Sequence, residues 1–211
     1  MKKLKRQYDN EDPSVTQILD VLRKIGLEMW FKFNTIEFIN KESSKGKLVG
    51  TQTHEAIESH INKEEVKIET EYHEEVMTAL KSFMLFKKEH PEVKLFNSEM
   101  MLTSDVHKFN GTMDCIGEID GEQVVFDWKT SQAKDKDKPT IYPEYLSQVS
   151  AYVTAYNEVN KTNICKAIIV SIAKDKVAYN YQMLEKEEIE NEFNEIFLPC
   201  LRILNYKRRN K

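Results

Sequence analysis

Two aspartates and a lysine lie within a short stretch whose spacing could support hydrolytic chemistry. The segment GTMDCIGEIDGEQVVFDWKTS occupies residues 111–131. Asp120-Gly121 inside it is typical of a two-residue hairpin loop, because Gly accepts the positive φ of a type I′ turn and Asp tolerates it. Counting outward from that loop pairs Ile119 with Glu122. Five steps further, Asp114 lies directly opposite Asp127.

The pairing predicts β-carbons of Asp114 and Asp127 about 4.5–5.5 Å apart on one face of the sheet. Lys129 should point to the same face, since side chains alternate along a strand. Two close carboxylates repel unless one is protonated or a cation lies between them. Hard oxygen ligands favour Mg²⁺, Mn²⁺ or Ca²⁺ over softer metals, so we predict metal-assisted phosphodiester hydrolysis with Lys129 beside the attacking water. The alternative is that all three are ordinary strand-end residues.

Hydrophobic patterns predict the elements that must position this hairpin. Helices are expected at 14–26, 45–62, 64–89, from Pro143 onward and at 185–206, where Pro199 could introduce a kink. Strands are expected at 93–102, 107–119, 122–130, 163–173 and 176–184. The order favours an α/β fold, in which the helix after the third strand crosses to a parallel fourth strand.

Composition limits the classes of function. The chain has 211 residues, 31% of them charged, and a formal net charge of −4, which argues against a protein that coats nucleic acid through a global basic excess. We expect a basic or polar tail at 1–12 and one domain at 13–211. Three scattered cysteines fit neither a disulfide framework nor a CxxC metal site. Without a secretion signal or a membrane-length apolar run, a cytoplasmic protein with no membrane partner is expected.

Several motifs in order resemble the PD-(D/E)xK nuclease superfamily, in its RecB-like exonuclease branch. They are Gly50-Thr51-x-x-His54-x-x-Ile57-Glu58, Gly111-Thr112-Met113-Asp114, Asp127-Trp128-Lys129-Thr130-Ser131 and Gln148-x-x-x-Tyr152. The earlier Pro13-Ser14-Val15-Thr16-x-Ile18-Leu19 resembles the opening of phage exonucleases of the mitochondrial genome maintenance type. The resemblance covers roughly residues 13–160.

The resemblance implies a restriction-endonuclease-like, three-layer αβα core with a mixed central sheet and additional N-terminal helices. It also implies Mg²⁺- or Mn²⁺-dependent exonucleolytic cleavage of single- or double-stranded DNA that has a free end. Members that carry an iron–sulfur cluster use four cysteines, so no cluster is expected here. The cell would be bacterial or phage-infected. Oligomeric state is not predicted.

Roles for individual residues follow from the same resemblance. The implied metal ligands are His54, Asp114, Asp127 and the carbonyl of Trp128. Lys129 would orient or deprotonate the attacking water, Gln148 and Tyr152 would support the site, and Glu99 would be a supporting carboxylate. Thr130, Ser131, Lys134 and Lys136 would contact DNA.

Structural alternatives stay open for several of these residues. His54 lies on an apolar helix stripe and could be a buried core histidine. Gln148 could be an ordinary polar helix residue, Tyr152 part of a core stripe, and the lysines after residue 133 a solvated loop. For the whole protein, the alternatives are a non-catalytic nucleic-acid-binding module with a nuclease fold and a hydrolase of small phosphoesters.

Overall fold

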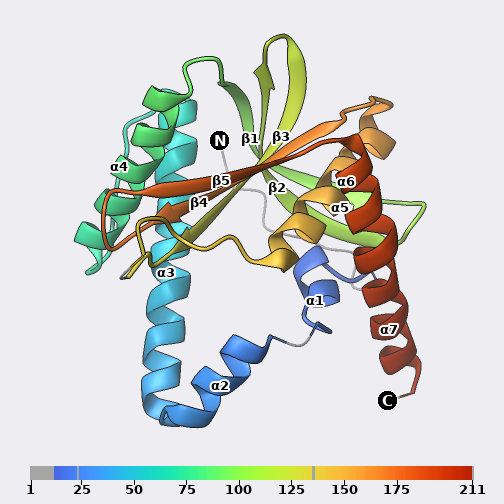
Figure 1. The fold of residues 1–211 in the computed structure, drawn as a ribbon, viewed down its shortest axis with the longest axis horizontal. Helices are drawn as coiled ribbons and strands as arrows, with labels where there is room; N and C mark the ends of the chain where they lie inside the picture. The colour runs from blue at the N-terminus through green and yellow to red at the C-terminus, as the bar shows by residue number, and fades with distance from the viewer. Residues whose placement is uncertain (1–11, 23, 135, 211) are drawn as a thin grey trace.

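The computed structural model describes residues 12–22, 24–134 and 136–210, so all but Asp12 of the expected tail lies outside the described residues. A five-stranded mixed sheet forms its centre (Figure 1). The strands are β1 (Lys94–Ser104), β2 (Phe109–Ile119), β3 (Glu122–Ser131), β4 (Lys166–Ala173) and β5 (Tyr179–Leu184), and they lie side by side in that order. β3 and β4 are parallel and the other neighbours antiparallel, which confirms the predicted parallel fourth strand.

Helices cover both faces of the sheet (Figure 1). On one face, α3 (Ile36–Ile61) and α4 (His73–Glu89) bury residues such as Phe83 and Phe86 against Trp128. On the other face lie α1 (Val15–Leu19), α5 (Pro143–Asn160), α6 (Lys186–Asn191), the π-helix η1 (Glu192–Phe197) and α7 (Leu198–Arg209). The two separate apolar clusters confirm the predicted α/β architecture with a mixed central sheet.

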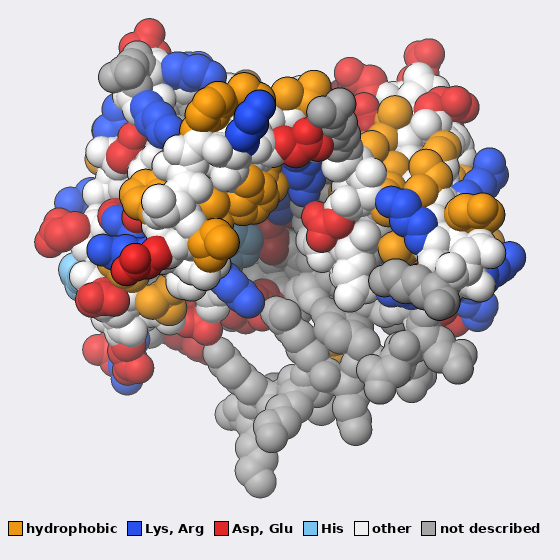
Figure 2. Space-filling view, turned by 90° about the horizontal axis from the view of Figure 1, so that it is seen from below, with side chains coloured by type: hydrophobic (Ala, Val, Ile, Leu, Met, Phe, Trp, Pro, Cys, Tyr) orange, Lys and Arg blue, Asp and Glu red, His pale blue; other side chains and the backbone are white. Residues whose placement is uncertain are grey.

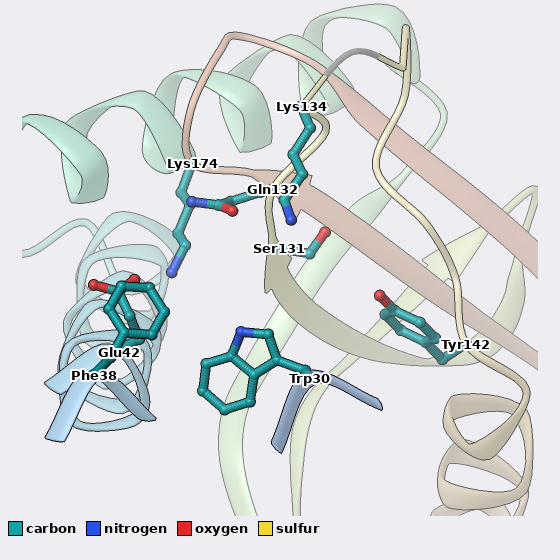
Figure 3. Close-up of a pocket in the computed structure, with 8 residues that line it drawn as sticks. All are labelled: Trp30, Phe38, Glu42, Ser131, Gln132, Lys134, Tyr142 and Lys174. Atoms are coloured by element: carbon teal, nitrogen blue, oxygen red, sulfur yellow. The ribbon is translucent and has the colours of Figure 1, made fainter. Parts of the chain in front are cut away.

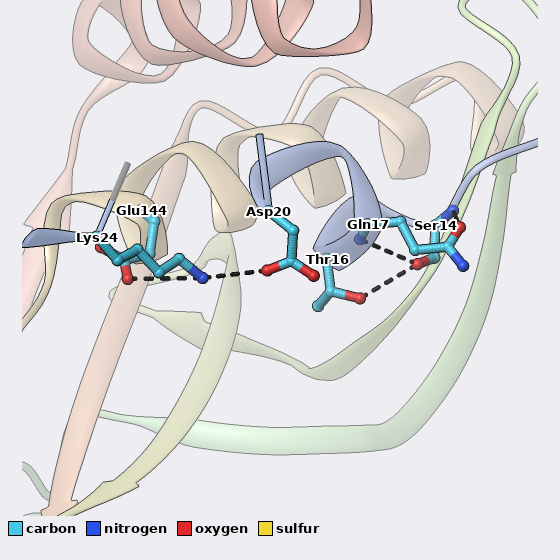
Figure 4. A network of polar contacts seen from close by, with 6 residues as sticks. All are labelled: Ser14, Thr16, Gln17, Asp20, Lys24 and Glu144. Carbon is cyan, nitrogen blue, oxygen red and sulfur yellow. Dashed lines mark hydrogen bonds and ion pairs between the residues drawn. The ribbon is translucent and has the colours of Figure 1, made fainter. Parts of the chain in front are cut away.

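The N-terminal helices differ from the prediction of one helix at 14–26. α1 starts at a capping box between Ser14 and Gln17 and ends at Leu19. α2 (Ile25–Phe33) follows its N-cap Lys24, whose ammonium lies 3.2 Å from Asp20 and 4.0 Å from Glu144 of α5 (Figure 4). These ion pairs connect the bend between the two helices to α5. Gly26 therefore lies inside α2 and does not end a helix.

The next two helices also have different bounds from those expected. α3 begins at Ile36, because the Thr35 side chain accepts a hydrogen bond from the Phe38 amide and caps the helix. With 26 residues it is roughly 39 Å long, and its buried residues all belong to its second half. α4 begins at His73, after a non-helical segment at 64–72 that ends in a turn and in which Val66 and Ile68 pack against the cluster between α3 and α4.

The closing helix, expected at 185–206, is present as three consecutive segments, α6, η1 and α7, and its irregular part lies close to Pro199, where a kink was expected. Proline lacks a backbone N–H and cannot complete the usual helical hydrogen bond to the residue four positions earlier. The π-helical segment ends at Phe197, two residues before Pro199, which lies in the first turn of α7, so the irregularity is absorbed as wider helical turns.

The hairpin between β2 and β3 has the predicted register. Ile119 pairs with Glu122, and the ladder continues as far as Cys115 with Phe126. Asp120 and Gly121 have φ values of 50° and 86°, as a type I′ loop requires. The ladder stops one step before the two aspartates, so their pairing is not the regular strand pair that we expected.

Candidate active site

Asp114 lies at a break in strand pairing on both sides of β2. The register with β3 ends at Cys115, and the register with β1 passes from Ser98–Cys115 to Met100–Met113 without an Asp114 pair. Its opposite position on β1 is Glu99, whose φ of 48° is left-handed. The alternation of faces also fails here, since Met113 joins the core beneath α5 and Cys115 the core beneath α3 and α4. Asp114 therefore lies in an opening of the sheet.

The Asp114 carboxylate is held by a strand on one side and a helix on the other. Its Oδ2 accepts a hydrogen bond from the Trp128 backbone N–H at 2.8 Å. Its Oδ1 lies 3.2 Å from His54 Nδ1 on α3. Helix α3 approaches β3 closely at Gly50, where an added Cβ would lie 3.4 Å from Thr130 Oγ1. A close helix–strand contact thus brings His54 to the carboxylate, and His54 is not an isolated core histidine.

Asp127 and Lys129 form the second half of the cluster. Lys129 Nζ lies 2.6 Å from Asp127 Oδ2, and the aspartate side chain is 1% exposed. Asp127 and Lys129 lie two and four residues after Val125 on β3, so the three side chains point to the same face of the sheet, which α5 covers. That Asp127 and Lys129 share a face agrees with the prediction. On that side, the ammonium of Lys129 lies 5.4 Å from the centre of the Tyr145 ring. Tyr145 carried no predicted role, although the sequence places it on α5 at helical spacing from Tyr152 and Tyr156.

The pKa values of the two carboxyl groups are shifted in opposite directions. Burial raises the pKa of Asp127 to about 6, and the nearby Asp114 charge adds to the rise against the opposing effect of Lys129. Burial also acts on Asp114, but His54, Lys129 and the Trp128 amide outweigh it and lower the pKa of this carboxyl. The pKa of His54 is raised because the Asp114 charge outweighs burial. At neutral pH both carboxyl groups therefore carry negative charge, and the buried Asp127 is the one that a compensating cation would stabilise most.

Glu99 reaches the edge of the same site. A narrow depression is lined by Glu99 together with His54, Ile57, Glu58, Ile61, Ser98, Asp114 and Trp128. The carboxyl group of Glu99 comes from the left-handed turn opposite Asp114 and is exposed. A role as a supporting carboxylate stays a prediction, but the chain does bring Glu99 beside the Asp114–His54 pair.

The side chains of Gln148 and Tyr152 are hydrogen-bonded to one another. Gln148 Nε2 donates a hydrogen bond of 2.8 Å to the Tyr152 hydroxyl, and both side chains are buried. The Tyr152 ring covers Gly111, where an added Cβ would lie only 2.7 Å from its Cε1 atom. Close packing on the Gly111-Thr112 segment explains the glycine there. These contacts agree with a core position for Tyr152, and catalytic roles for the pair stay predictions.

The donors suit a hard divalent cation, although no ready-made cage is present. Among the described residues, no three His, Cys, Asp or Glu side chains gather closely enough to form a metal-binding group. Two features still fit a cation: the buried Asp127 carboxylate and the adjoining Asp114–His54 pair. The ladder ends before Trp128, so a ligand role for its carbonyl stays a prediction. Mg²⁺ is commonly held by only one or two carboxylates, with waters completing its shell.

A cleft adjoins this cluster at the end of β3 (Figure 3). It is lined by Trp30, Phe38, Glu42, Ser131, Gln132, Lys134, Tyr142 and Lys174. Figure 2 shows that the face seen from below is hollowed, with hydrophobic side chains gathered beside the hollow. Of the predicted DNA contacts, Ser131 and Lys134 line the cleft. Thr130 instead faces α3 at Gly50, and Lys136 Nζ donates to Thr140 Oγ1 within its own loop.

Six residues of the cleft carried no predicted role: Trp30, Phe38, Glu42, Gln132, Tyr142 and Lys174. Trp30 and Phe38 belong to the stretch MWFKFNTIEFI, whose aromatic content was visible in the sequence but whose structure was ambiguous. Tyr142 precedes α5, and Lys174 follows β4. Only the folded chain brings these distant segments to one cleft. In the described parts of the chain, no helix is both long and apolar enough to cross a membrane.

Comparison with known proteins agrees with the nuclease-like site. The family model for the PD-(D/E)XK nuclease superfamily matches residues 37–208, and the chain belongs to this superfamily. The match begins near the start of α3 and extends into α7, so it contains the sheet and the whole carboxylate cluster. The predicted superfamily is thereby confirmed.

Individual relatives are more distant. A mouse protein named mitochondrial genome maintenance exonuclease 1 is 31% identical over 158 residues, covering 70% of this chain and 45% of its own length. Its human counterpart is 27% identical over 187 residues, covering 82% and 53%. The chain thus spans about half the length of these curated relatives. A solved alkaline exonuclease from Laribacter hongkongensis is 15% identical, with coverage of 94% and 92% and a TM-score of 0.42.

Proposed function

We propose that this nuclease-superfamily protein is a divalent-metal-dependent deoxyribonuclease that degrades DNA from a free end. The observation that supports the proposal best is the cluster at the opening of the β2–β3 ladder. There, Asp114 contacts both His54 and the Trp128 amide, and the buried Asp127 contacts Lys129. The relatives named as exonucleases support the same reaction class. A cytoplasmic location stays a prediction.

The proposed metal ligands are Asp114, Asp127, His54 and the Trp128 carbonyl. A bound divalent cation would polarise the scissile phosphate and make a bound water a stronger nucleophile at neutral pH. Mg²⁺ or Mn²⁺ is the expected ion because the donor set is dominated by carboxylate oxygen.

The protein's own residues contribute orientation and charge. The Trp128 amide and His54 fix the two oxygens of Asp114 in place, which limits its rotation. Lys129 lies within ion-pair distance of Asp127, and Tyr145 covers it on the α5 side. In this position its ammonium can stabilise negative charge on the phosphate, or orient the water that attacks it.

The test is incubation of end-labelled single- and double-stranded DNA with Mg²⁺ or Mn²⁺. Lys129→Ala and Asp127→Asn should each lower the rate by about 100-fold or more. The matched controls are Asp105→Ala and Lys108→Ala, since this exposed pair lies in the turn between β1 and β2, and both should retain the parent rate. Covalently closed circular DNA should be resistant if a free end is required.

Each rival function has its own outcome in that experiment. DNA binding without metal-dependent turnover would favour a non-catalytic nucleic-acid-binding module. Cleavage of small phosphodiesters without a preference for polymer would favour a small-molecule hydrolase. Equal rates for the parent and Lys129→Ala would contradict the proposed site while leaving nuclease activity to be explained by other residues.

A further inference from the structure

We propose that the cleft beside the catalytic cluster binds an unpaired nucleotide of the DNA substrate, with its base stacked on Trp30 and its phosphates near Lys134 and Lys174. This inference rests on the proposed nuclease function and adds a substrate subsite to it. The cleft lies outside the carboxylate cluster, and its Trp30 wall comes from α2, before the start of the superfamily match at residue 37.

The cleft is connected to the reacting groups through side-chain contacts. Tyr142 lines the cleft, and its ring contacts that of Tyr145 edge to face, with centroids 5.5 Å apart. Tyr145 in turn lies beneath Lys129, which contacts Asp127. Ser131, also on the cleft wall, follows Lys129 by two residues on the same side of β3, a distance of about 7 Å. That distance corresponds to roughly two base steps along a stacked strand.

The aromatic side chains of α2, which include the Trp30 wall of the cleft, are not buried by the rest of the described chain. No residue of α2 is buried, and Phe31 and Phe33 are 47% and 71% exposed. Trp30 is half-buried against Phe31 and Phe38, with ring centroids 5.4 and 6.3 Å away. Figure 3 shows its indole across the cleft from Ser131, with Tyr142 at the far end. An indole presented in this way offers a stacking surface.

Charge decides between a nucleotide and a protein segment as the occupant. Lys134 and Lys174 extend toward the cleft from the side opposite α2 (Figure 3). An aromatic platform facing cationic side chains is the usual arrangement for single-stranded nucleic acid. Glu42 lies on the same wall as Phe38 and offsets part of this positive charge, which restricts phosphate binding to the lysine side. A purely apolar helix would place no negative charge beside Lys134 and Lys174, whereas the phosphates of a nucleotide would.

The lysine side is held in place before any substrate arrives. The Ala133 and Lys134 amides donate to the two oxygens of Asp175 at 2.9 and 2.8 Å. Ser171 Oγ contacts Ser131 Oγ at 3.1 Å and donates to the Thr140 carbonyl at 3.0 Å. These contacts join the segment after β3 to β4 and to the turn after it. Binding therefore requires little ordering of this wall, which favours affinity.

The experiment measures binding and cleavage separately. Metal-free protein in chelator is titrated with a short single-stranded oligonucleotide, and with a strand of the same length that carries abasic sugars. The parent should bind the base-bearing strand about tenfold more tightly than the abasic one, with quenching of tryptophan emission. Trp30→Ala should lose this discrimination, and Trp30→Phe should retain most of it while losing the quenching.

Steady-state cleavage with Mg²⁺ or Mn²⁺ provides the second measurement. Trp30→Ala should raise KM for the single-stranded oligonucleotide about tenfold with little change in kcat. Phe33→Ala is the matched control, because it removes an exposed aromatic ring of α2 that does not line the cleft, and its KM should match the parent's. Thermal unfolding of each variant verifies that it is folded.

The outcomes separate this inference from the proposed function. An active parent whose base preference and KM survive in Trp30→Ala would overturn the subsite and leave the nuclease intact. A parent that cleaves no DNA but shows Trp30-dependent base discrimination would overturn the nuclease proposal and support the subsite. Equal binding of base-bearing and abasic strands by the parent would also overturn the subsite, and would leave the aromatic wall for a protein partner.

Discussion

Trp128 donates its backbone N–H to Asp114 Oδ2 at 2.8 Å, across the opening where the β2–β3 ladder has ended. In an uninterrupted hairpin the same N–H would point toward the backbone of Met113. A side-chain carboxylate thus replaces a strand partner, and the Trp128 amide keeps an acceptor. The replacement fixes Asp114 beside the end of β3, where Asp127 and Lys129 lie.

Asp127→Asn should change how the stability of the metal-free protein depends on pH. The folded-state pKa of about 6 exceeds the ordinary value of 3.8, so the folded protein binds more protons than the unfolded chain between these values. The free energy of unfolding should therefore fall as pH rises through this window, by at most about 3 kcal/mol. Denaturant unfolding from pH 4 to 7 should show this loss in the parent and not in the variant. A pH-independent difference between the two would contradict the pKa shift.

His54→Ala should weaken metal binding while leaving the fold in place. If the imidazole is a ligand, calorimetric titration with Mn²⁺ should show affinity at least about tenfold below that of the parent. Asp127→Asn should weaken it further, because a charged ligand is lost. His73→Ala removes an exposed histidine at the start of α4 and serves as the control. Unaltered Mn²⁺ affinity in His54→Ala would show that this residue only orients Asp114.

Two glycine-to-alanine substitutions should have opposite effects on stability. At Gly111 the new Cβ would lie 2.7 Å from the Tyr152 ring and 3.1 Å from Val15 Cγ2, so overpacking should cost about 1–3 kcal/mol. At Gly46, inside α3, nothing lies within 4 Å, and alanine should stabilise the helix by about 0.5–1 kcal/mol. Urea unfolding of both variants tests the pair. A neutral Gly111→Ala would mean that α1 and α5 move apart easily.

Asp175→Ala should loosen the segment that carries Lys134. Its carboxylate accepts hydrogen bonds from the Ala133 and Lys134 amides, and these would lose their acceptor. Amide hydrogen exchange at residues 133 and 134 should accelerate by about tenfold or more, which corresponds to about 1.4 kcal/mol of lost local protection. Asp105→Ala, in the exposed turn between β1 and β2, is the control and should leave exchange at these positions unchanged. Unchanged exchange in Asp175→Ala would indicate that other contacts hold the segment.

Local sequence signals were sufficient for the hairpin and for the residues that carry its chemistry. Asp120-Gly121 determines the turn, and the turn determines every pair out to Cys115 with Phe126. Alternation along β3 then assigns Asp127 and Lys129 to one face. These features depend on neighbours in the chain, so they can be counted from the sequence.

Tertiary contacts decided the remaining geometry. Strand alternation does not predict the opening at Asp114, because the opening depends on the left-handed Glu99 opposite it and on contacts with His54. Helix bounds between residues 14 and 73 differed because caps, the Lys24 bridge and packing of Val66 and Ile68 outweighed periodicity.

The sequence by itself determined which side chains could do the chemistry, because residue type and strand register are local properties. Only the folded chain brought Trp30 and Phe38 to the same cleft as Lys134 and Lys174, and connected that cleft to Lys129 through Tyr142 and Tyr145. These segments are separated by up to about 140 residues, and their meeting depends on how helices pack on the sheet, which no local pattern specifies.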